Sequence, residues 1–470
     1  MNFIAQLIEE SAPGGHALIA IGEQGERSEV TFGALAERTA RLSGHLAALG
    51  LARGDVVVTL LGSRPEWVYA MCGSLRGGLV VLPCAEQLRA ADLAKRLEIS
   101  GARAVITDSR NLATVEQAGF TGIVVDGGQP PQADPAPAAD LDERDPALML
   151  FTSGTSGAPK PILHGQRFLS GQTVQAEHWF GAQPGEVAWC TGTSGWSKSA
   201  RNVFLAPWLG GATALLEDAR FDPARRLETL QRERVNVLCM APTEYRALVK
   251  RTDLGELPDL RHAVAAGEPL NPEVIRAFHA ATGIEIHDGY GQTETGALTG
   301  MPIGAPVRPG SMGKPLPGID AWVEDGELCV APESVPTFSL GAPDGPWRTG
   351  DRVREDEEGY LWFEGRADDV IISAGYRIGP FEVESALISH ASVLEAAAVA
   401  APDELRGQIV RAIVVLRDGV EPCPALTREL QEHVKDLTAP YKYPRVIDYA
   451  PSLPKTASGK IQRALLRAAP

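Results

Sequence analysis

The stretch LMLFTSGTSGAPKPILHG, residues 148–165, joins a short apolar run to a segment made mostly of glycine, serine and threonine. Glycines let backbone amides turn toward an anion, hydroxyl groups donate hydrogen bonds to it, and Lys160 adds a positive charge. The spacing is not that of a Walker A loop, because Ala158 and Pro159 separate Gly157 from Lys160. Taken alone, the stretch predicts either a phosphate-binding loop or a surface turn rich in serine and glycine.

Length and composition restrict the class of protein. A chain of 470 residues is long for a single core, so two or more domains are expected. The formal net charge of −16 argues against a general nucleic-acid binder, which needs a basic face. The six cysteines are scattered, which predicts reduced, mostly buried thiols rather than disulfides or a zinc site. Without a signal-peptide pattern or a run of about 20 apolar residues, we expect a cytoplasmic protein with no stable membrane insertion.

The alternation of helical and β-rich patterns predicts parallel strands covered by helices over residues 30–125. A connector rich in glycine, proline and alanine, residues 126–140, interrupts this rhythm and is expected to be a solvated loop. A second α/β stretch follows and includes residues 235–270. Short strands and turns at about 305–366 predict a small β-rich unit, and the rest of the chain has a mixed α/β pattern.

Further motifs follow the opening stretch in order: DGYGQTET at 288–295, WRTGD at 347–351, GRADDVIISAGYRIGPFEVE at 365–384 and PKTASGK at 454–460. Together with that stretch they resemble the adenylate-forming, or AMP-binding, superfamily of acyl-CoA synthetases, luciferases and peptide-synthetase adenylation domains. The resemblance spans essentially the whole chain. Within the superfamily, TSGWSKSA at 193–200 and residues 439–467 look most like the medium-chain acyl-CoA synthetase branch.

The resemblance implies an α/β fold with a large N-terminal domain of two α/β subdomains plus a small β-rich unit. A small, mobile α+β C-terminal domain follows. The expected boundaries are residues 1–366 for the N-terminal AMP-binding domain, 367–369 for a hinge and 370–470 for the C-terminal AMP-binding domain. Asp368 matches the hinge position of the family.

The resemblance also implies a reaction in two halves that uses ATP, Mg²⁺ and coenzyme A. A small-molecule carboxylic acid attacks the α-phosphorus of ATP and expels pyrophosphate, and the thiol of coenzyme A then displaces AMP. Both reactants of the first half are anionic, so catalysis consists mainly of charge neutralisation and alignment. The expected assembly is a monomer or a homodimer.

The family motifs map the ATP and AMP contacts onto three groups of residues. The opening loop is expected to hold the β- and γ-phosphates, AAGEPL lines the adenine pocket, and the remaining motifs surround the adenylate. The predicted contacts are Thr152, Ser153, Gly154, Thr155, Ser156, Gly157, Ala158, Pro159, Lys160, Gly267, Glu268, Pro269, Asp288, Gly289, Tyr290, Gly291, Gln292, Thr293, Asp351, Arg366 and Lys460. Read alone, AAGEPL is an ordinary strand followed by a turn.

Individual residues in these motifs receive roles from the resemblance. Tyr290 is expected to stack on adenine, while Asp351 accepts hydrogen bonds from both ribose hydroxyls and Arg366 also reaches the ribose. Glu294 resembles the magnesium-linked carboxylate of the family. Lys460 matches the lysine that bridges the substrate carboxylate and the α-phosphate. The predicted catalytic residues are Lys460, Thr155 and Glu294.

Coenzyme A carries phosphates, so its site needs cationic and aromatic groups. Positions that match coenzyme A contacts of the medium-chain branch are Gln87, Ala374, Gly375, Tyr376, Arg377, Arg406, Lys435 and Tyr443. A glycine at 375 suits a narrow pantetheine tunnel that leaves no room for a Cβ. Trp196 is expected at the acyl pocket, with Lys198 near the same channel, although Trp196 fits a core position equally well.

The sequence leaves the substrate and some competing functions open. A medium-chain or aromatic monocarboxylate is the expected substrate, ahead of acetate-sized and long-chain acids. The alternatives are transfer of the acyl group to a carrier protein or an amine, a phosphotransferase that produces ADP, and a non-catalytic adenylate-binding protein. Lys460 and the loop at 372–379 are both needed at the adenylate in different steps, so we expect the C-terminal domain to rotate about the hinge.

Overall fold

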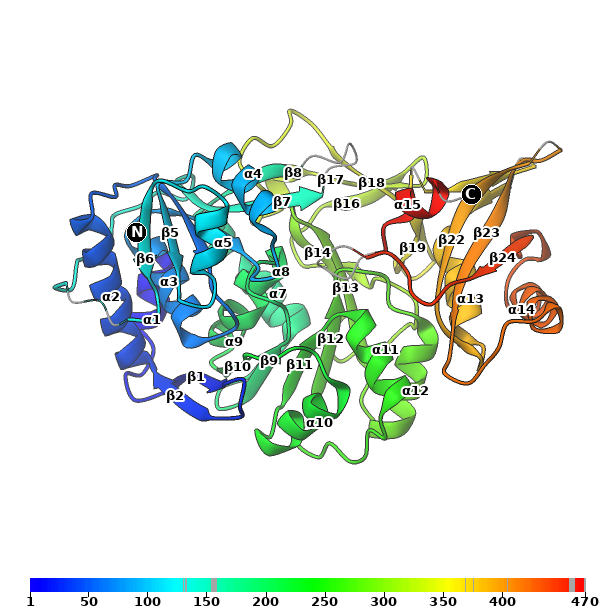
Figure 1. Ribbon diagram of the computed structural model, residues 1–470, viewed down its shortest axis with the longest axis horizontal. Coiled ribbons are helices and arrows are strands. Elements are labelled where there is room, and N and C mark those ends of the chain that lie inside the picture. Colours follow the sequence, from blue (N-terminus) through cyan, green and yellow to red (C-terminus); the bar gives the residue numbers. More distant parts are fainter. Residues whose placement is uncertain are drawn as a thin grey trace.

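The computed structural model describes residues 1–129, 131, 133–153, 159–367, 369–374, 376–403, 405–455 and 461–468. Its first sheet has the strand order β6-β5-β3-β4-β7-β8, in which β8 closes a parallel set by pairing antiparallel to β7 (Figure 1). The strands are β3 (Val56–Leu60), β4 (Val80–Cys84), β5 (Ala104–Thr107), β6 (Ile123–Asp126), β7 (Pro146–Ser153) and β8 (Pro159–Gly165).

Both faces of this sheet are buried, which explains its continuous apolar strands. Val57 packs in one core cluster with Leu42 and Trp67, whereas its neighbour Val58 packs in another with Leu93. Successive side chains of a strand point to opposite faces, so each face contacts its own helices. The helices of this region are α1 (Phe3–Glu9), α2 (Phe32–Ala48), α3 (Pro65–Arg76), α4 (Ala90–Ser100) and α5 (Leu112–Gln117).

The second sheet has the order β15-β14-β13-β12-β11-β9-β10-β1-β2, and its strands from β13 through β1 in that order are parallel. Leu238 and Cys239 of β11 again lie in different core clusters. The strands are β1 (His16–Ile21), β2 (Arg27–Thr31), β9 (Val187–Cys190), β10 (Thr213–Glu217), β11 (Val237–Met240), β12 (His262–Ala266), β13 (Ile286–Gln292), β14 (Gly296–Gly300) and β15 (Lys314–Pro315).

Several α-helices and two π-helices, some of them only one turn long, accompany this second sheet. They are α6 (Arg167–Ser170), α7 (Gln172–Gln175), η1 (Ala176–Phe180), α8 (Ser197–Ser199), η2 (Ala200–Leu205), α9 (Ala206–Leu209), α10 (Pro223–Arg232), α11 (Pro242–Arg251) and α12 (Pro272–Thr282). Both η1 and η2 are π-helical. This conformation is rare overall, and where it occurs it is often at a functional site.

An antiparallel β-rich unit follows, with the order β16-β17-β18-β19. Its strands are β16 (Ala321–Glu324), β17 (Glu327–Val330), β18 (Trp347–Glu355) and β19 (Leu361–Arg366), with a 3₁₀ turn, η3 (Pro332–Ser334), between β17 and β18. In the turn-rich segment before β18, Phe338 is buried and packs edge-on against Trp347, with ring centroids 5.6 Å apart. The segment is therefore anchored to the β-rich unit by an aromatic contact.

The C-terminal part of the chain forms its own layer of helices on a sheet, at the right of Figure 1. Val383 and Leu387 of one helix and Leu430 and Val434 of another pack with strand residues in one core cluster. The elements are β20 (Ile371–Ser373), β21 (Tyr376–Ile378), α13 (Pro380–Ser389), β22 (Val393–Asp403), β23 (Gly407–Leu416), α14 (Pro424–Leu437), η4 (Pro440–Lys442), β24 (Val446–Tyr449) and α15 (Arg463–Ala468).

Lys250 of α11 joins the N-terminal part to the C-terminal layer. Its Nζ donates hydrogen bonds to the carbonyl oxygens of Ile388, at 3.1 Å, and Val393, at 2.7 Å. Burial lowers the pKa of Lys250 to about 8. Nearby, the rings of Phe363 and Phe381 pack edge to face across the same junction.

The predicted fold class is confirmed: two α/β layers, a β-rich unit and a C-terminal α+β layer occur in the expected order. All six cysteines are free and only Cys423 is exposed, as the scattered spacing predicts. Among the helices of the described residues, none is long and apolar enough to cross a membrane.

Gly195 brings the two α/β layers into close contact. A Cβ at this position would overlap the backbone nitrogen of Ala85, at the end of β4, and lie 2.7 Å from its Cα. Next to it, Ser194 Oγ donates to the carbonyl oxygen of Leu61, after β3, at 2.5 Å. The loop after β9 is therefore held by the first sheet.

We expect Gly195→Ala to lower the free energy of unfolding by about 1–3 kcal/mol, because the added methyl group must push two layers of backbone apart. Urea unfolding followed by far-UV circular dichroism measures this. Gly14→Ala is the matched control, since nothing lies within 4 Å of a Cβ placed there, and it should change stability by less than about 0.5 kcal/mol. Equal effects of the two substitutions would contradict the close contact.

Candidate active site

The candidate site lies where parallel strands of the second sheet end. Strands β9, β11, β12 and β13 are neighbours, so the loops that follow them meet at one edge of the sheet. In open α/β sheets, ligands bind at the carboxyl ends of the strands. The motif residues at 193–200 and 267–269 follow β9 and β12, and those at 288–295 comprise the end of β13 and the residues after it.

The glycine- and serine-rich stretch connects two antiparallel strands. Thr152 of β7 pairs with Lys160 of β8, so these two residues lie opposite each other at the ends of the stretch. Thr152 is half-buried and Lys160 is exposed. Residues 154–158 of the predicted phosphate loop lie outside the described residues, as do the side chains of Ser153 and Pro159. The arrangement differs from a Walker A loop, which leads from a strand into a helix.

Asp351 is the centre of a polar cluster that the structure builds from three motifs. Its side chain is buried, and its Oδ2 accepts hydrogen bonds from the hydroxyl of Tyr290 and from Nε2 of Gln292, the latter at 2.9 Å. Arg366 Nη1 donates to its Oδ1 at 3.3 Å. Burial, followed by the charge of Asp351, raises the pKa of Tyr290, which keeps its hydroxyl protonated as a donor. The structure therefore brings together Tyr290, Gln292, Asp351 and Arg366, which come from separate motifs.

Gln292 has a larger role than its place in the motif suggests. In addition to its hydrogen bond to Asp351, its Nε2 donates to the carbonyl oxygen of Thr349 at 2.7 Å. Its Oε1 accepts a hydrogen bond from Trp347 Nε1 at 3.0 Å. These bonds hold β18 against the end of β13. Trp347 was not among the predicted site residues, although its place in WRTGD could have indicated it.

Lys198 is buried between the adenine-pocket motif and the loop after β13. Its Nζ donates to the carbonyl oxygen of Ala266 at 2.6 Å. Gly267 has φ of +108°, and a Cβ there would lie 3.0 Å from this Nζ, so the position favours glycine. Burial, more than the neighbouring Glu268, raises the pKa of Asp288, whereas Lys198 opposes that shift. The Lys198 ammonium also lies 5.1 Å from the ring centre of the half-buried Trp196.

The carboxylates of Glu268 and Glu294 differ in their hydrogen-bond partners. Glu268 Oε1 accepts hydrogen bonds from the backbone nitrogen of Thr243, at 3.1 Å, and from its hydroxyl, at 2.7 Å. Glu294 is half-buried, and its backbone oxygen accepts from Ser339. Its carboxylate makes no hydrogen bond or ion pair with another residue that the structure describes. The carboxylate of Glu294 is therefore available to a ligand.

His164 supports the loop that carries these residues. Its Nε2 lies 2.8 Å from the carbonyl oxygen of Thr293, so the ring donates from this nitrogen. Burial lowers the pKa of His164 to about 4, with a smaller contribution from the positive charge of Arg201. The imidazole is consequently neutral at neutral pH and acts as a structural support.

The C-terminal layer brings some of the predicted coenzyme A contacts together. Ala374, with φ of +49°, donates its backbone N–H to the carbonyl oxygen of Arg406 at 3.0 Å. Lys435 Nζ lies 4.3 Å from the ring centre of Tyr443. Tyr376 is exposed and stacks on Tyr441, with ring centroids 4.2 Å apart.

The other predicted site positions lie apart from these residues of the C-terminal layer or outside the described residues. Gln87 is exposed at the end of β4, on the first sheet. Gly375, Asp368 and Lys460 lie outside the described residues, as does the side chain of Arg377. Arg463, three residues after Lys460, forms an ion pair with Glu384 at 2.8 Å and lies 3.7 Å from Asp369. Burial opposes the shift, but the charge of Glu384, followed by those of Asp369 and Glu268, raises the pKa of Arg463.

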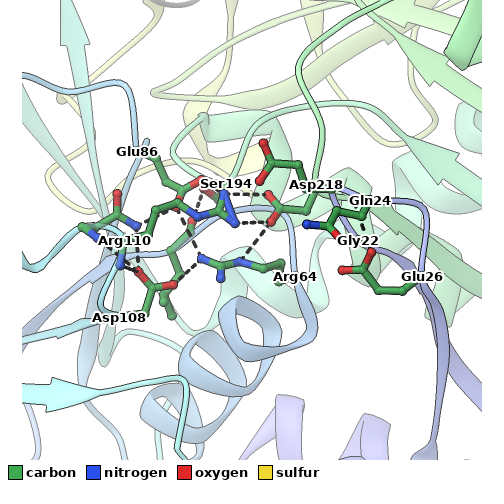
Figure 2. Close-up of polar contacts among 12 residues, drawn as sticks. Gly22, Gln24, Glu26, Arg64, Glu86, Asp108, Arg110, Ser194 and Asp218 are labelled. Atoms are coloured by element: carbon green, nitrogen blue, oxygen red, sulfur yellow. Dashed lines mark hydrogen bonds and ion pairs between the residues drawn. The ribbon is translucent and has the colours of Figure 1, made fainter.

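A network of charges around the buried carboxylates of Asp108 and Asp218, which the sequence did not reveal, joins the two sheets (Figure 2). Arg64, after β3, forms ion pairs with Asp108, after β5, and with Asp218, after β10, the latter at 3.3 Å. Arg110 donates to Asp218 at 2.6 Å, and Glu86 lies 3.4 Å from Arg64. The network fixes the ends of four strands relative to one another. The residues of the network lie in separate loops that carry none of the family motifs, so no local sequence pattern predicts that they meet.

Comparison with known proteins supports the same identification as the motifs. The AMP-binding enzyme family model matches residues 8–341, and the AMP-binding enzyme C-terminal domain model matches residues 382–460. The uncharacterised acyl–CoA ligase YtcI of Bacillus subtilis is 40% identical over 99% of this chain and 95% of its own. The mitochondrial acyl-coenzyme A synthetase ACSM3 of Mus musculus is 38% identical over 89% of this chain and 80% of its own.

A solved structure shows the same architecture. The benzoate CoA ligase of Burkholderia xenovorans matches with a TM-score of 0.87 and 30% identity, covering 99% of this chain and 100% of its own. The predicted resemblance to adenylate-forming enzymes, and to the acyl-CoA synthetase branch, is confirmed by these matches.

We expect the free energy of unfolding to fall at acidic pH because His164 and His262 are buried in their neutral forms. Burial lowers the pKa of each to about 4, whereas an unfolded histidine has a pKa of about 6.5. Between these values the unfolded state binds more protons, so the free energy of unfolding falls as the pH drops. At about pH 5 each histidine should cost about 2 kcal/mol relative to neutral pH, as measured by urea unfolding.

The variant His164→Gln should lose about half of this pH dependence. His178→Gln is the control, because His178 is exposed and lies on η1, and it should retain the full dependence. An unchanged pH dependence in His164→Gln would show that its imidazole is not held neutral.

Proposed function

This chain belongs to the AMP-binding enzyme family as an acid–thiol ligase, and from that premise we propose which of its residues carry each step. The enzyme is an acyl-CoA synthetase: it activates a carboxylic acid with ATP to acyl-AMP and pyrophosphate, then transfers the acyl group to coenzyme A and releases AMP. The assignments below rest on the geometry at the strand ends of the second sheet.

The cluster around Asp351 is proposed as the nucleoside site. The observation that supports it best is that Tyr290, Gln292 and Arg366 all direct donors at one buried carboxylate. A carboxylate held in this way is rigid, and a diol can exchange with one of these donors. The ring of Tyr290, fixed by its hydroxyl, offers a flat face for the adenine. Gly267 permits close approach of the base because it lacks a Cβ.

Adenylation requires that two anions meet. An oxygen of the substrate carboxylate forms a bond to the α-phosphorus while the bond to the bridging oxygen of pyrophosphate breaks. We assign the positive charge at this centre to Lys460, and the binding of the β- and γ-phosphates to residues 152–160 with Lys160. Thr152 and Lys160, opposite each other at the ends of that stretch, support this placement.

Magnesium is proposed at Glu294. Among the described residues, no group of three or more histidine, cysteine or acidic side chains could hold a metal ion. Mg²⁺ at a nucleotide needs only one or two protein carboxylates, since phosphate oxygens and water supply its other ligands. The unpaired carboxylate of Glu294 fits that requirement. When bound, the ion neutralises the phosphates of ATP.

Thioester formation is assigned to the C-terminal layer. The thiol sulfur of coenzyme A bonds to the acyl carbonyl carbon and AMP leaves with the electron pair of the broken C–O bond. We propose that residues 374–377 line the pantetheine path and that Arg406, Lys435 and Tyr443 contact the nucleotide part. Ala374 and Arg406 are neighbours through a hydrogen bond, which supports a common surface.

The two steps need different positions of the C-terminal layer. We assign Lys460, which belongs to the C-terminal layer, to the adenylate in the first step. The loop at 374–377 belongs to the same layer and cannot occupy that place simultaneously. We therefore propose domain boundaries at residues 1–366 and 370–470, with rotation about the hinge at 367–369.

Lys460→Ala and Asp368→Pro should affect opposite halves of the reaction. Loss of Lys460 should slow pyrophosphate release by about 100-fold or more, because a charge at the transition state is removed. Its effect on thioester formation from supplied acyl-AMP should be small. Asp368→Pro fixes φ at the hinge, so it should slow the second half far more than the first. Similar losses in both halves for either variant would contradict that assignment.

Removing Arg406 and Lys435 together, by substitution with Ala, should raise the KM for coenzyme A by about 10-fold or more, since each is assigned to a phosphate. The KM for ATP should stay unchanged. Steady-state kinetics with each substrate varied in turn measures this. Arg41→Ala is the control, because Arg41 lies on α2, at the opposite end of the molecule in Figure 1. Acyl-AMP formation without any thioester would favour a carrier protein or an amine as the acceptor.

A further inference from the structure

Arg201 is a buried cation that has no partner in the described chain. It lies in the π-helix η2 and is only 8% exposed. Its Nε is buried without a hydrogen-bond acceptor, and its guanidinium makes no hydrogen bond or ion pair with a described residue. Burial lowers the pKa of Arg201 to about 10, so it still carries its charge at neutral pH.

Other buried arginines of this chain have carboxylate partners. Arg226 forms ion pairs with Glu217, at 3.0 Å, and with Glu244, at 3.2 Å, and Arg76 is paired with Glu9. Asn202, the residue after Arg201, also has its polar side chain satisfied, since its Oδ1 accepts from Gln175. Because an unpaired buried charge is costly, the exception at Arg201 points to a ligand that completes it.

Arg201 lies directly behind the loop that carries the proposed adenylate contacts. A Cβ at Gly296, two residues after Glu294, would lie 3.6 Å from Arg201 Nη1. On its own helix segment, Arg201 follows Lys198, which contacts Ala266 at the end of β12. The guanidinium therefore lies beside the start of β14, on the helical segment that follows Trp196, which was predicted to line the acyl pocket.

The other titratable groups around Arg201 are histidine and thiols rather than carboxylates. His164 is neutral because burial lowers its pKa to about 4. Cys190 and Cys239 are buried and share a hydrogen bond that lowers the pKa of Cys190 and raises that of Cys239. A thiolate at Cys190 is the one alternative counter-ion among these groups, and the experiment below separates it from a ligand.

We infer that Arg201 selects carboxylic acids that carry a second carboxylate, at the end of the acyl group remote from the reacting one. The inference rests on the proposed function, since it assigns the substrate class of the same site, and it differs from the monocarboxylate that the sequence suggests. A guanidinium binds a carboxylate through two parallel hydrogen bonds. An acid that ends in a methyl group instead leaves this charge buried and unpaired, so it is rejected.

The test compares matched acids in the purified full-length enzyme with ATP, Mg²⁺ and coenzyme A. Succinate is compared with butanoate, adipate with hexanoate and suberate with octanoate, and kcat/KM is measured from pyrophosphate release. For at least one pair the wild-type enzyme should prefer the diacid. Arg201→Met should reduce kcat/KM for that diacid by on the order of 100-fold and leave or raise kcat/KM for the matched monoacid. Arg201→Lys should retain part of the diacid preference.

The thermal stability of Arg201→Met separates a ligand role from a structural one. Removing an unpaired buried charge should leave the Tm unchanged or raise it. A lowered Tm together with equal losses for both acids would overturn the inference and would indicate a pair with the Cys190 thiolate or with the reacting carboxylate. A wild-type preference for monoacids would also overturn it while the ligase function stands. Failure to release pyrophosphate with any carboxylic acid would instead overturn the proposed function.

Discussion

Asp351 is a carboxylate that the fold buries, and the cost of burying it fixes much of the arrangement around it. A buried carboxylate without donors would cost several kcal/mol, so the donors from Tyr290, Gln292 and Arg366 are held in place by it. Tyr290 and Gln292 lie at the carboxyl end of β13, whereas Asp351 and Arg366 belong to the β-rich unit. The same hydrogen bonds that build the proposed nucleoside site therefore also hold the β-rich unit against the second sheet.

Positive charge in this acidic chain is concentrated at a few places near the strand ends. The chain has a formal net charge of −16, yet Lys198 and Arg201 are both buried beside the loop after β13. Lys198 is satisfied by the carbonyl oxygen of Ala266 rather than by a carboxylate. Its charge therefore remains largely uncompensated locally, which suits a site whose reactants are both anions.

The contacts of the C-terminal layer are consistent with a part of the molecule that docks and separates. Lys250 holds the layer through two backbone carbonyl oxygens, and burial of its ammonium lowers its pKa to about 8. The two hydrogen bonds fix the geometry of the junction. They stabilise it only modestly, because the Lys250 ammonium loses its hydration when the layer docks. A junction of this kind permits rotation about a short hinge without loss of the cores on either side.

The sequence by itself determined the family, the order of the layers and the motifs that meet at the site. Those features are local: strand periodicity, glycine and hydroxyl spacing, and short motifs such as WRTGD are readable from neighbours along the chain. Only the tertiary structure decided that Gln292 anchors Trp347 and that Arg64 joins Asp108 and Asp218. It also decided that no carboxylate of the described residues pairs with Arg201. The physical reason is that burial and ion pairing depend on residues distant in the chain, so no local pattern of residue types specifies which charges are compensated.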